Sequence, residues 1–133
     1  ELKHTPIDVQ FSFPEPSLLV VSDPRLLEQV FVNLITNAIH AVSENRDTGG
    51  YVKLTTRRTD SEIEIDIEDN GGGIPEAIQA DVFGLFYTTK PPGKGTGLGL
   101  AICQNIIKNL GGTIRLESKE GVGTRFTVKI SAV

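Results

Sequence analysis

The sequence predicts an α/β domain in which two long helices are combined with short strands. Apolar residues within 26–42 recur every three to four positions, the spacing of one helix face. Isoleucines alternate with acidic residues over 62–68, as in a strand with one buried face. A second apolar helical pattern covers 98–110 and stops at Gly111-Gly112, because glycine favours a helix C-terminus.

The remaining elements are shorter. Asp23-Pro24 supplies an N-cap and a first-turn proline for the long helix, which should end near 43–45. Phe83 and Phe86 are expected to anchor the segment that follows them. Strands are expected at 8–13, 18–21 and 51–58, the last forming an antiparallel hairpin with 62–68, then a short helix at 75–82 and a final hairpin of 113–118 with 124–130.

Composition limits the functions that are open to the chain. With 133 residues, 38% of them hydrophobic, it suits one globular domain. The net charge of −4 and scattered Lys and Arg argue against nucleic-acid binding. The single cysteine, Cys103, lies in an apolar helical pattern and is read as a buried structural thiol. No hydrophobic run reaches membrane-span length and no signal-peptide pattern is present, so we expect a cytoplasmic domain. We also expect the chain to be a fragment of a longer protein.

The long helix also has an unusual polar stripe. Gln29, Asn33, Thr36, Asn37 and His40 fall on one side at 3.6 residues per turn. Asparagine is a poor helix former, yet two lie four residues apart. Their amide oxygens could face a cation or a phosphate group, or the stripe could be an ordinary polar face that tolerates two asparagines.

A glycine run follows the acidic strand. The sequence DNGGGIP at 69–75 places Asp69 at the end of a buried strand, and three glycines allow a sharp turn or a close approach. A carboxylate only accepts hydrogen bonds, so a partly buried one favours a donor such as an exocyclic amine. The alternative is an ordinary Asp-Asn-Gly turn.

Residues 88–100 form a glycine-rich segment that enters the second helix. Glycine loops at helix N-termini bind anions through free N–H groups and the helix dipole, and Lys90 and Lys94 add positive charge. The spacing matches neither the phosphate-loop pattern nor a dinucleotide fold. The segment nevertheless adds a third feature, after the asparagine stripe and Asp69, that points to a phosphorylated ligand.

These stretches together resemble the boxes of the sensor histidine kinases. NLITNAIHA at 33–41 resembles the N box, DNGGGIP at 69–75 the G1 box, and VFGLFYTTK at 82–90 the F box. GKGTGLGL at 93–100 resembles the G2 box, and GVGTRF at 121–126 the closing glycine–threonine motif. All five occur in the family's order, which is typical of the catalytic and ATP-binding domain within the superfamily of DNA gyrase B, Hsp90 and MutL.

The resemblance implies a two-layer α/β sandwich, the Bergerat ATP-binding fold, with helices on one face of a mixed, mostly antiparallel sheet. It implies ATP and Mg²⁺ as cofactors and transfer of the γ-phosphoryl group to a histidine on a separate dimerisation domain. His4 and His40 lie in no such acceptor motif. The expected partners are that domain and a response regulator, with a monomeric isolated domain and a homodimeric parent.

The resemblance also implies residue roles. Asn37 would hold Mg²⁺, Asn33 would replace the catalytic glutamate of gyrase-type relatives, and Lys90 would neutralise phosphate charge. Asp69 would accept the adenine amine, with Thr124 in support. The implied nucleotide contacts are Asn33, Asn37, His40, Ala41, Asp69, Gly71, Gly73, Ile74, Phe86, Thr88, Thr89, Lys90, Lys94, Gly95, Thr96, Gly97, Leu98, Gly99, Leu100 and Thr124.

Two other functions remain open at this point. One is an anti-sigma-factor kinase of the same superfamily, which phosphorylates serine on a partner protein. The other is a non-enzymatic docking module that has kept the fold and binds nucleotide weakly or not at all. The F box and the sequence Thr-Gly-Leu-Gly-Leu at 96–100 favour a histidine kinase. The intact Asn37, Asp69 and glycine set argues against a docking module.

Overall fold

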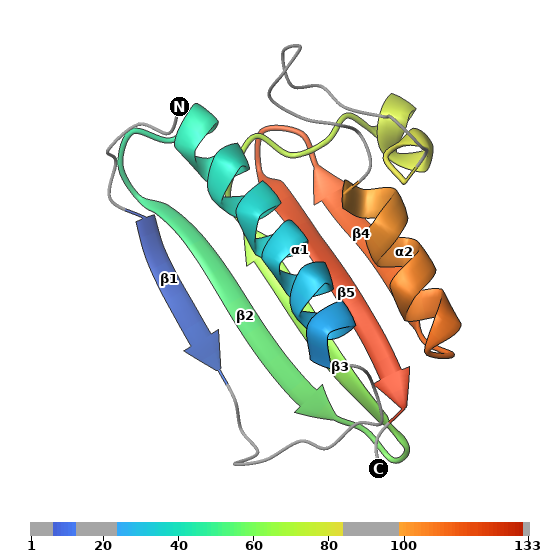
Figure 1. The fold of residues 1–133 in the computed structure, drawn as a ribbon. Coiled ribbons are helices and arrows are strands. Elements are labelled where there is room, and N and C mark those ends of the chain that lie inside the picture. The colour runs from blue at the N-terminus through green and yellow to red at the C-terminus, as the bar shows by residue number, and fades with distance from the viewer. Residues whose placement is uncertain (1–6, 13–23, 84–98, 132–133) are drawn as a thin grey trace.

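A computed structural model describes residues 7–12, 24–83 and 99–131, and every structural statement below concerns these ranges. In Figure 1 the α-helices lie beside the sheet. The elements in chain order are β1 (Ile7–Ser12), α1 (Pro24–Asn45), β2 (Gly50–Arg58), β3 (Glu62–Asp69), the 3₁₀ helix η1 (Glu76–Asp81), α2 (Gly99–Asn109), β4 (Thr113–Lys119) and β5 (Gly123–Ser131).

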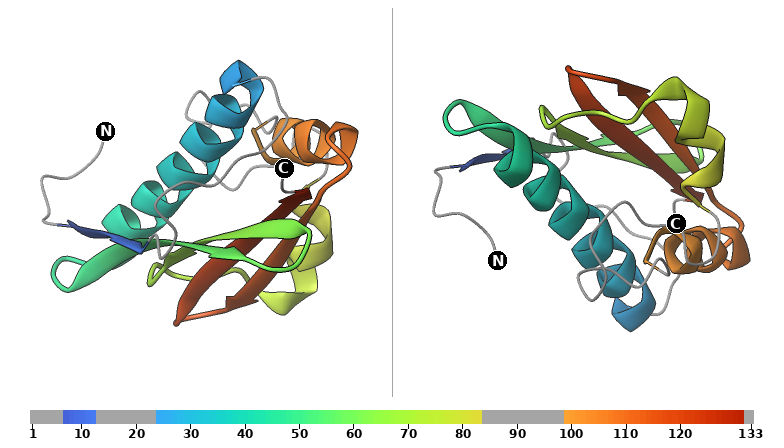
Figure 2. Two further views of the ribbon diagram at one scale, coloured as in Figure 1. Left: turned by 90° about the horizontal axis from the view of Figure 1, so that it is seen from below. Right: turned by 90° about the horizontal axis from the view of Figure 1, so that it is seen from above.

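The described strands form one sheet in the order β1-β2-β3-β5-β4. The β1–β2 pair is parallel, and the other three pairs are antiparallel. Both α-helices lie on the same face of this sheet, as the end-on views in Figure 2 show. The predicted two-layer sandwich with a mixed, mostly antiparallel sheet is therefore confirmed.

Helix α1 supplies the largest part of the helical layer. Val30, Leu34, Ala38 and Val42 follow one another at intervals of four residues and are all buried. They pack against β2, β3 and α2. The apolar residues of α1 therefore recur at helical spacing, because only one side of the helix faces these elements. Burial of a side chain such as that of Leu34 contributes about 1.5–3 kcal/mol. The helix begins at Pro24 and ends at Asn45, as the sequence indicated.

Strands β2 and β3 form the antiparallel hairpin that the sequence predicted. Ile63, Ile65 and Ile67 are buried beneath the helices. The backbone amide of Thr59 donates to the carbonyl of Glu62 at 2.9 Å, which closes the turn over 59–61. The prediction of an antiparallel hairpin with one buried face is confirmed.

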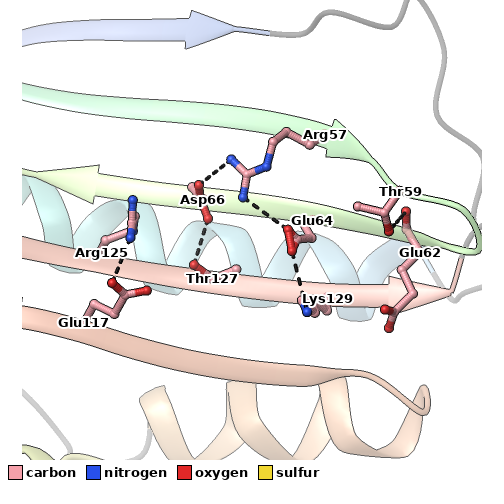
Figure 3. Close-up of polar contacts among 9 residues, drawn as sticks. All are labelled: Arg57, Thr59, Glu62, Glu64, Asp66, Glu117, Arg125, Thr127 and Lys129. Carbon is pink, nitrogen blue, oxygen red and sulfur yellow. Dashed lines mark hydrogen bonds and ion pairs between the residues drawn. The ribbon is translucent and has the colours of Figure 1, made fainter.

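The opposite face of the sheet differs from the fully solvated surface that its acidic residues suggested. Asp66 is only 6% exposed. Arg57 donates to its carboxylate at 2.7 Å, and the hydroxyl of Thr127 donates to it at 2.7 Å (Figure 3). Burial pushes the pKa of Asp66 upward, but these two hydrogen bonds outweigh burial and hold the pKa below its usual value.

Helix α2 ends as predicted. Gly111 has φ +77°, and the amide of Gly112 donates to the carbonyl of Ile107 at 2.9 Å, so the glycines terminate the helix. Cys103 is fully buried, as expected for a structural thiol. No helix in the described ranges is long and apolar enough to cross a membrane.

Other predicted elements changed or could not be compared. The helix expected at 75–82 is a 3₁₀ helix, Glu76–Asp81. Phe83 packs edge-on against Phe126, with ring centroids 6.1 Å apart. Phe86 and the segment that the two aromatic residues were expected to anchor lie outside the described residues. The strand expected at 18–21 and the glycine-rich segment before Gly99 lie outside the described residues.

Candidate functional site

The end of β3 carries a buried carboxylate. Asp69 is 5% exposed and lies directly opposite Val52 on β2 and Thr124 on β5. The amide of Gly71 donates to its Oδ1 at 2.8 Å, and the backbone of Thr124 also donates to the carboxylate. Two fixed donors orient this group, and a carboxylate has lone pairs to accept further hydrogen bonds.

Asp69 has a perturbed pKa. Burial raises it from 3.8 to about 6, and the hydrogen bonds from the backbone of Gly71 and Thr124 oppose the rise. At pH 7 roughly nine-tenths of the molecules therefore carry the ionised form. The site presents a buried hydrogen-bond acceptor at neutral pH.

The glycine run after Asp69 packs closely against other parts of the chain. A Cβ atom on Gly71 would lie 2.7 Å from the carbonyl carbon of Ala41 on α1, so no other residue fits there without a shift. Gly73 has φ +71° and passes close to the carbonyl of Lys119. The sequence analysis assigned these glycines to an approach of the backbone to nucleotide. In the structure the close approach is to α1 and to the β4–β5 turn.

Hydrogen bonds fix this loop on both sides. Arg46, just after α1, donates its Nε–H to the carbonyl of Asn70 at 2.7 Å. The Asn70 side chain accepts from the amide of Tyr51 and donates to the carbonyl of Gly49. The amide of Gly121 donates to the carbonyl of Gly72 at 2.7 Å. The loop therefore forms a rigid wall between α1 and the β4–β5 turn.

Ser118 is a residue that the sequence analysis missed. Its hydroxyl accepts the amide of Ile74 at 2.7 Å and lies 2.9 Å from the hydroxyl of Thr124. It also donates to the carbonyl of Gly123 at 2.9 Å. The available signal was its position: Ile114, Leu116 and Ser118 alternate on one face of β4, so a hydroxyl takes the place of an apolar side chain.

The polar stripe of α1 faces the start of α2 at one end. A Cβ atom on Gly99 would lie 3.8 Å from Cγ of Asn33. The Asn33 side chain also hydrogen-bonds Cys103, whose thiol pKa is raised by burial. Asn37 and His40, partly buried, follow Asn33 along the same helix.

Two contacts mark positions along α1 beside this stripe. Asn33 lies at Gly99, and Ala41 lies against Gly71, eight residues further along α1. At 1.5 Å per residue this separation is about 12 Å. The structure therefore aligns the Asp69 loop, the polar stripe of α1 and the first turn of α2 along one line.

The predicted site residues fall into two groups, those that the structure describes and those that lie outside the described residues. Leu100 lies in the first turn of α2, next to Gly99, and Ile74 ends the loop that begins at Asp69. Within the described ranges no three His, Cys, Asp or Glu side chains gather as a metal cluster. Outside the described residues are Phe86, Thr88, Thr89, Lys90, Lys94, Gly95, Thr96, Gly97 and Leu98.

Comparisons with known proteins agree with this architecture. Residues 22–133 match the model of the histidine kinase-, DNA gyrase B- and HSP90-like ATPases. The structure is similar to that of the catalytic domain of histidine kinase ThkA, with a TM-score of 0.81 and 36% sequence identity. The match covers 94% of this chain and 80% of the ThkA chain. The fold is thus that of a histidine kinase catalytic domain.

Similar sequences belong to bacterial sensor kinases. The chain is 39% identical to sporulation kinase C of Bacillus subtilis over 110 residues, which are 83% of this chain and 24% of that protein. It is 35% identical to the sensor histidine kinase ZraS of Escherichia coli K12 over 122 residues, 92% of this chain and 25% of that protein. The chain spans about a quarter of the length of these relatives. It belongs to the histidine kinase-, DNA gyrase B- and HSP90-like ATPase family, as a catalytic ATPase domain of the two-component sensor type.

Proposed function

We propose that this domain binds Mg-ATP along the line from Asp69 to the start of α2 and donates the γ-phosphoryl group to a histidine on a separate dimerisation domain. The observation that carries the proposal is the buried, ionised Asp69, oriented by two backbone donors at the end of β3. A carboxylate that accepts two backbone hydrogen bonds still has lone pairs free, and an exocyclic amine of a ligand is a donor that fits them.

The adenine end follows from this carboxylate. Asp69 accepts the amine, and Thr124, its direct cross-strand neighbour, supports it. Gly71 and Gly73 let the loop pack closely against α1 and the β4–β5 turn. Ile74, at the end of the loop, lines the base. Arg46 and Asn70 hold the loop in place, so the acceptor is positioned before the ligand arrives.

The phosphate end lies along the polar stripe of α1. The roughly 12 Å between the Asn33 and Ala41 contacts is comparable with the length of a nucleoside triphosphate. The amide oxygen of Asn37 fits Mg²⁺, which prefers oxygen ligands and completes its shell with phosphate oxygens and water. His40 adds positive charge when protonated. Gly99 and Leu100 bring the free N–H groups of the first turn of α2.

The transfer step demands positioning and charge neutralisation more than covalent chemistry from this chain. Asn33 carries an amide, which cannot take a proton as a carboxylate does, so it does not activate water. The site therefore favours transfer to an acceptor that brings its own nucleophile, a histidine imidazole. Magnesium, when bound, neutralises charge on the phosphates. Lys90 and Lys94, outside the described residues, are proposed to add to this neutralisation.

In this proposal the domain is the cytoplasmic catalytic part of a larger kinase, whose other regions can anchor it to a membrane. The acceptor histidine belongs to the dimerisation and phosphotransfer domain of the parent protein, and the phosphoryl group then passes to a response regulator. Support comes from the similarity to sensor kinases, of which this chain spans about a quarter. The isolated domain is proposed to be a monomer and the parent a homodimer.

Calorimetric titration tests the nucleotide half of the proposal. The domain is titrated with ADP and a non-hydrolysable ATP analogue, each with and without Mg²⁺, and with GTP as a control. We expect adenine-selective binding that strengthens with Mg²⁺. A folded domain that binds none of these would contradict the proposal. Phosphorylation of the parent's dimerisation domain in trans, and its loss when the acceptor histidine is changed to glutamine, tests the transfer half.

A further inference from the structure

We infer that Ser118 is a positioning residue that fixes the direction of the Thr124 hydroxyl and thereby makes the site select a 6-amino purine over a 6-oxo purine. The inference rests on the proposed function, because it concerns the base end of the same site. Ser118 lies on β4 and touches no predicted phosphate-binding residue. It acts through Thr124, which lies directly opposite it on β5.

The three hydrogen bonds of Ser118 leave one consistent arrangement of protons. A serine hydroxyl has one donor and two acceptor positions. The amide of Ile74 can only donate, so Ser118 accepts there at 2.7 Å. The carbonyl of Gly123 can only accept, so Ser118 donates there at 2.9 Å. Its single proton is then used.

The contact with Thr124 must therefore run in the other direction. The two hydroxyl oxygens are 2.9 Å apart, and either could donate by distance alone. If Ser118 donated to Thr124, its oxygen would face the Gly123 carbonyl at 2.9 Å without a proton between them, which is repulsive. Thr124 is thus the donor, and its own oxygen keeps only acceptor capacity for a ligand.

This assignment pairs two acceptors at the base end. Asp69 and Thr124 are directly opposite on β3 and β5 and share the face that the helices cover. Side chains in such pairs have Cβ atoms about 4.5–5.5 Å apart. Asp69 is ionised at neutral pH and accepts only, and Thr124 now does the same. Both residues are more than nine-tenths buried, so water compensates poorly for a mismatch.

Purines differ at position 6, where the substituent either donates or accepts hydrogen bonds. A 6-amino group carries two hydrogens and can satisfy two acceptors. In a 6-oxo purine, the ring N1–H can still donate to the carboxylate, but the 6-oxygen then meets the lone pairs of Thr124. Without Ser118, the Thr124 hydroxyl could turn and donate to that oxygen. Loss of Ser118 should therefore help a 6-oxo purine relative to a 6-amino purine.

The test compares ADP with IDP, whose base differs from adenine at position 6 without an added 2-amino group. Both are titrated calorimetrically into the wild-type domain and into Ser118→Ala. We expect the ratio of the ADP and IDP dissociation constants to shift toward IDP by about tenfold, the scale of one mispaired buried polar contact. Ser118→Thr, which keeps a hydroxyl, should retain the wild-type ratio. Thr113→Ala, at an exposed position of the same strand, is the control for a neutral change.

A merely structural role for Ser118 gives a different result. Loss of its bonds to Ile74 and Gly123 would lower the melting temperature and weaken ADP and IDP by the same factor, and an unchanged ratio overturns the inference. If Ser118→Ala does not fold, Ser118→Cys fills the position with a slightly larger group that hydrogen-bonds much more weakly, and the same ratio of dissociation constants decides. A wild-type domain that binds no adenine nucleotide contradicts the proposed function instead, and is recognised before any variant is measured.

Discussion

Asp69 and Thr124 are direct partners across β3 and β5, and the backbone of Thr124 donates a hydrogen bond to the Asp69 carboxylate. A second donor comes from Gly71, two residues along the chain. The carboxylate is thus held from a neighbouring strand and from its own loop. This double support explains how a group with a raised pKa can keep a defined direction inside the protein.

Replacing Asp69 with asparagine tests whether this carboxylate recognises the base. The amide has one acceptor in place of two and presents an NH₂ group to a ligand amine, so ADP binding should weaken by about 1–3 kcal/mol. Isothermal calorimetry measures the change. Glu62→Gln, at the other end of β3, is the matched control and should leave the affinity unchanged. Equal affinity of wild type and Asp69→Asn would remove Asp69 from the adenine site.

The binding of adenosine should depend on pH through the same group. The pKa of Asp69 is raised to about 6, so the carboxyl becomes protonated as the pH falls through that value. Protonation removes acceptor capacity, and affinity should fall by up to about tenfold per pH unit below 6. Adenosine is the right probe because it lacks phosphates, which titrate in the same range. In Asp69→Asn the affinity should be flat from pH 5 to pH 7, and a parallel slope in that variant would assign the titration to another group.

Local patterns predicted the elements because the forces that set them are local. The four-residue spacing of Val30, Leu34, Ala38 and Val42 determined the buried face of α1. The alternation over 62–68 determined which residues of β3 lie beneath the helices. Asp69 was also predictable, since a carboxylate at the end of a buried strand followed by glycines is unusual in sequence alone.

Contacts between distant residues were not predictable from these patterns. Ser118 reaches Ile74 across 44 positions in the chain, and Thr127 reaches Asp66 across 61. An alternating strand pattern classifies Asp66 as solvent-facing, because it carries no information about an arginine on the next strand. The reason for Gly71 is equally remote, since the backbone it approaches belongs to Ala41. The sequence patterns therefore drew attention to Asp69 but not to the distant residues that hold its loop in place.

Two glycines in the same loop should respond differently to a methyl group. In Gly71→Ala the new Cβ would lie 2.7 Å from a backbone carbon of Ala41, which cannot move aside without shifting α1. We expect a loss of about 1–3 kcal/mol in the free energy of unfolding. In Gly72→Ala the obstacle is the exposed side chain of Asn45, which can rotate away, at a cost of about 1 kcal/mol. Urea denaturation measures both, and equal losses would contradict the contact with Ala41.

The hydroxyl of Thr127 should stabilise the charge of Asp66. Thr127→Val keeps the shape of the side chain but removes a 2.7 Å hydrogen bond to a carboxylate that is 6% exposed. We expect a loss of about 1–3 kcal/mol at pH 7. Because the pKa of Asp66 is held below 3.8, this contribution is present above that value and is lost as the pH falls further. The stabilities of the wild type and the variant should therefore approach each other as the pH falls below 3.8. Thr55→Val, on the other side of Asp66, is the control.

Replacing Asn37 with alanine tests whether this residue binds Mg²⁺ and leaves recognition of the base unchanged. If the Asn37 amide oxygen holds Mg²⁺, the variant should lose the gain in ADP affinity that Mg²⁺ brings to the wild type, while adenosine binding stays the same. The physical reason is that Asn37 lies on α1, between the Asn33 and Ala41 contacts, whereas the proposed acceptor of the base, Asp69, lies on β3. Asn105→Ala, an exposed amide on α2, is the control and should keep the full Mg²⁺ effect. Titration of ADP with Mg²⁺ and with a chelator decides between the possibilities: an equal loss of affinity in both conditions would mean that Asn37 shapes the site without binding the metal.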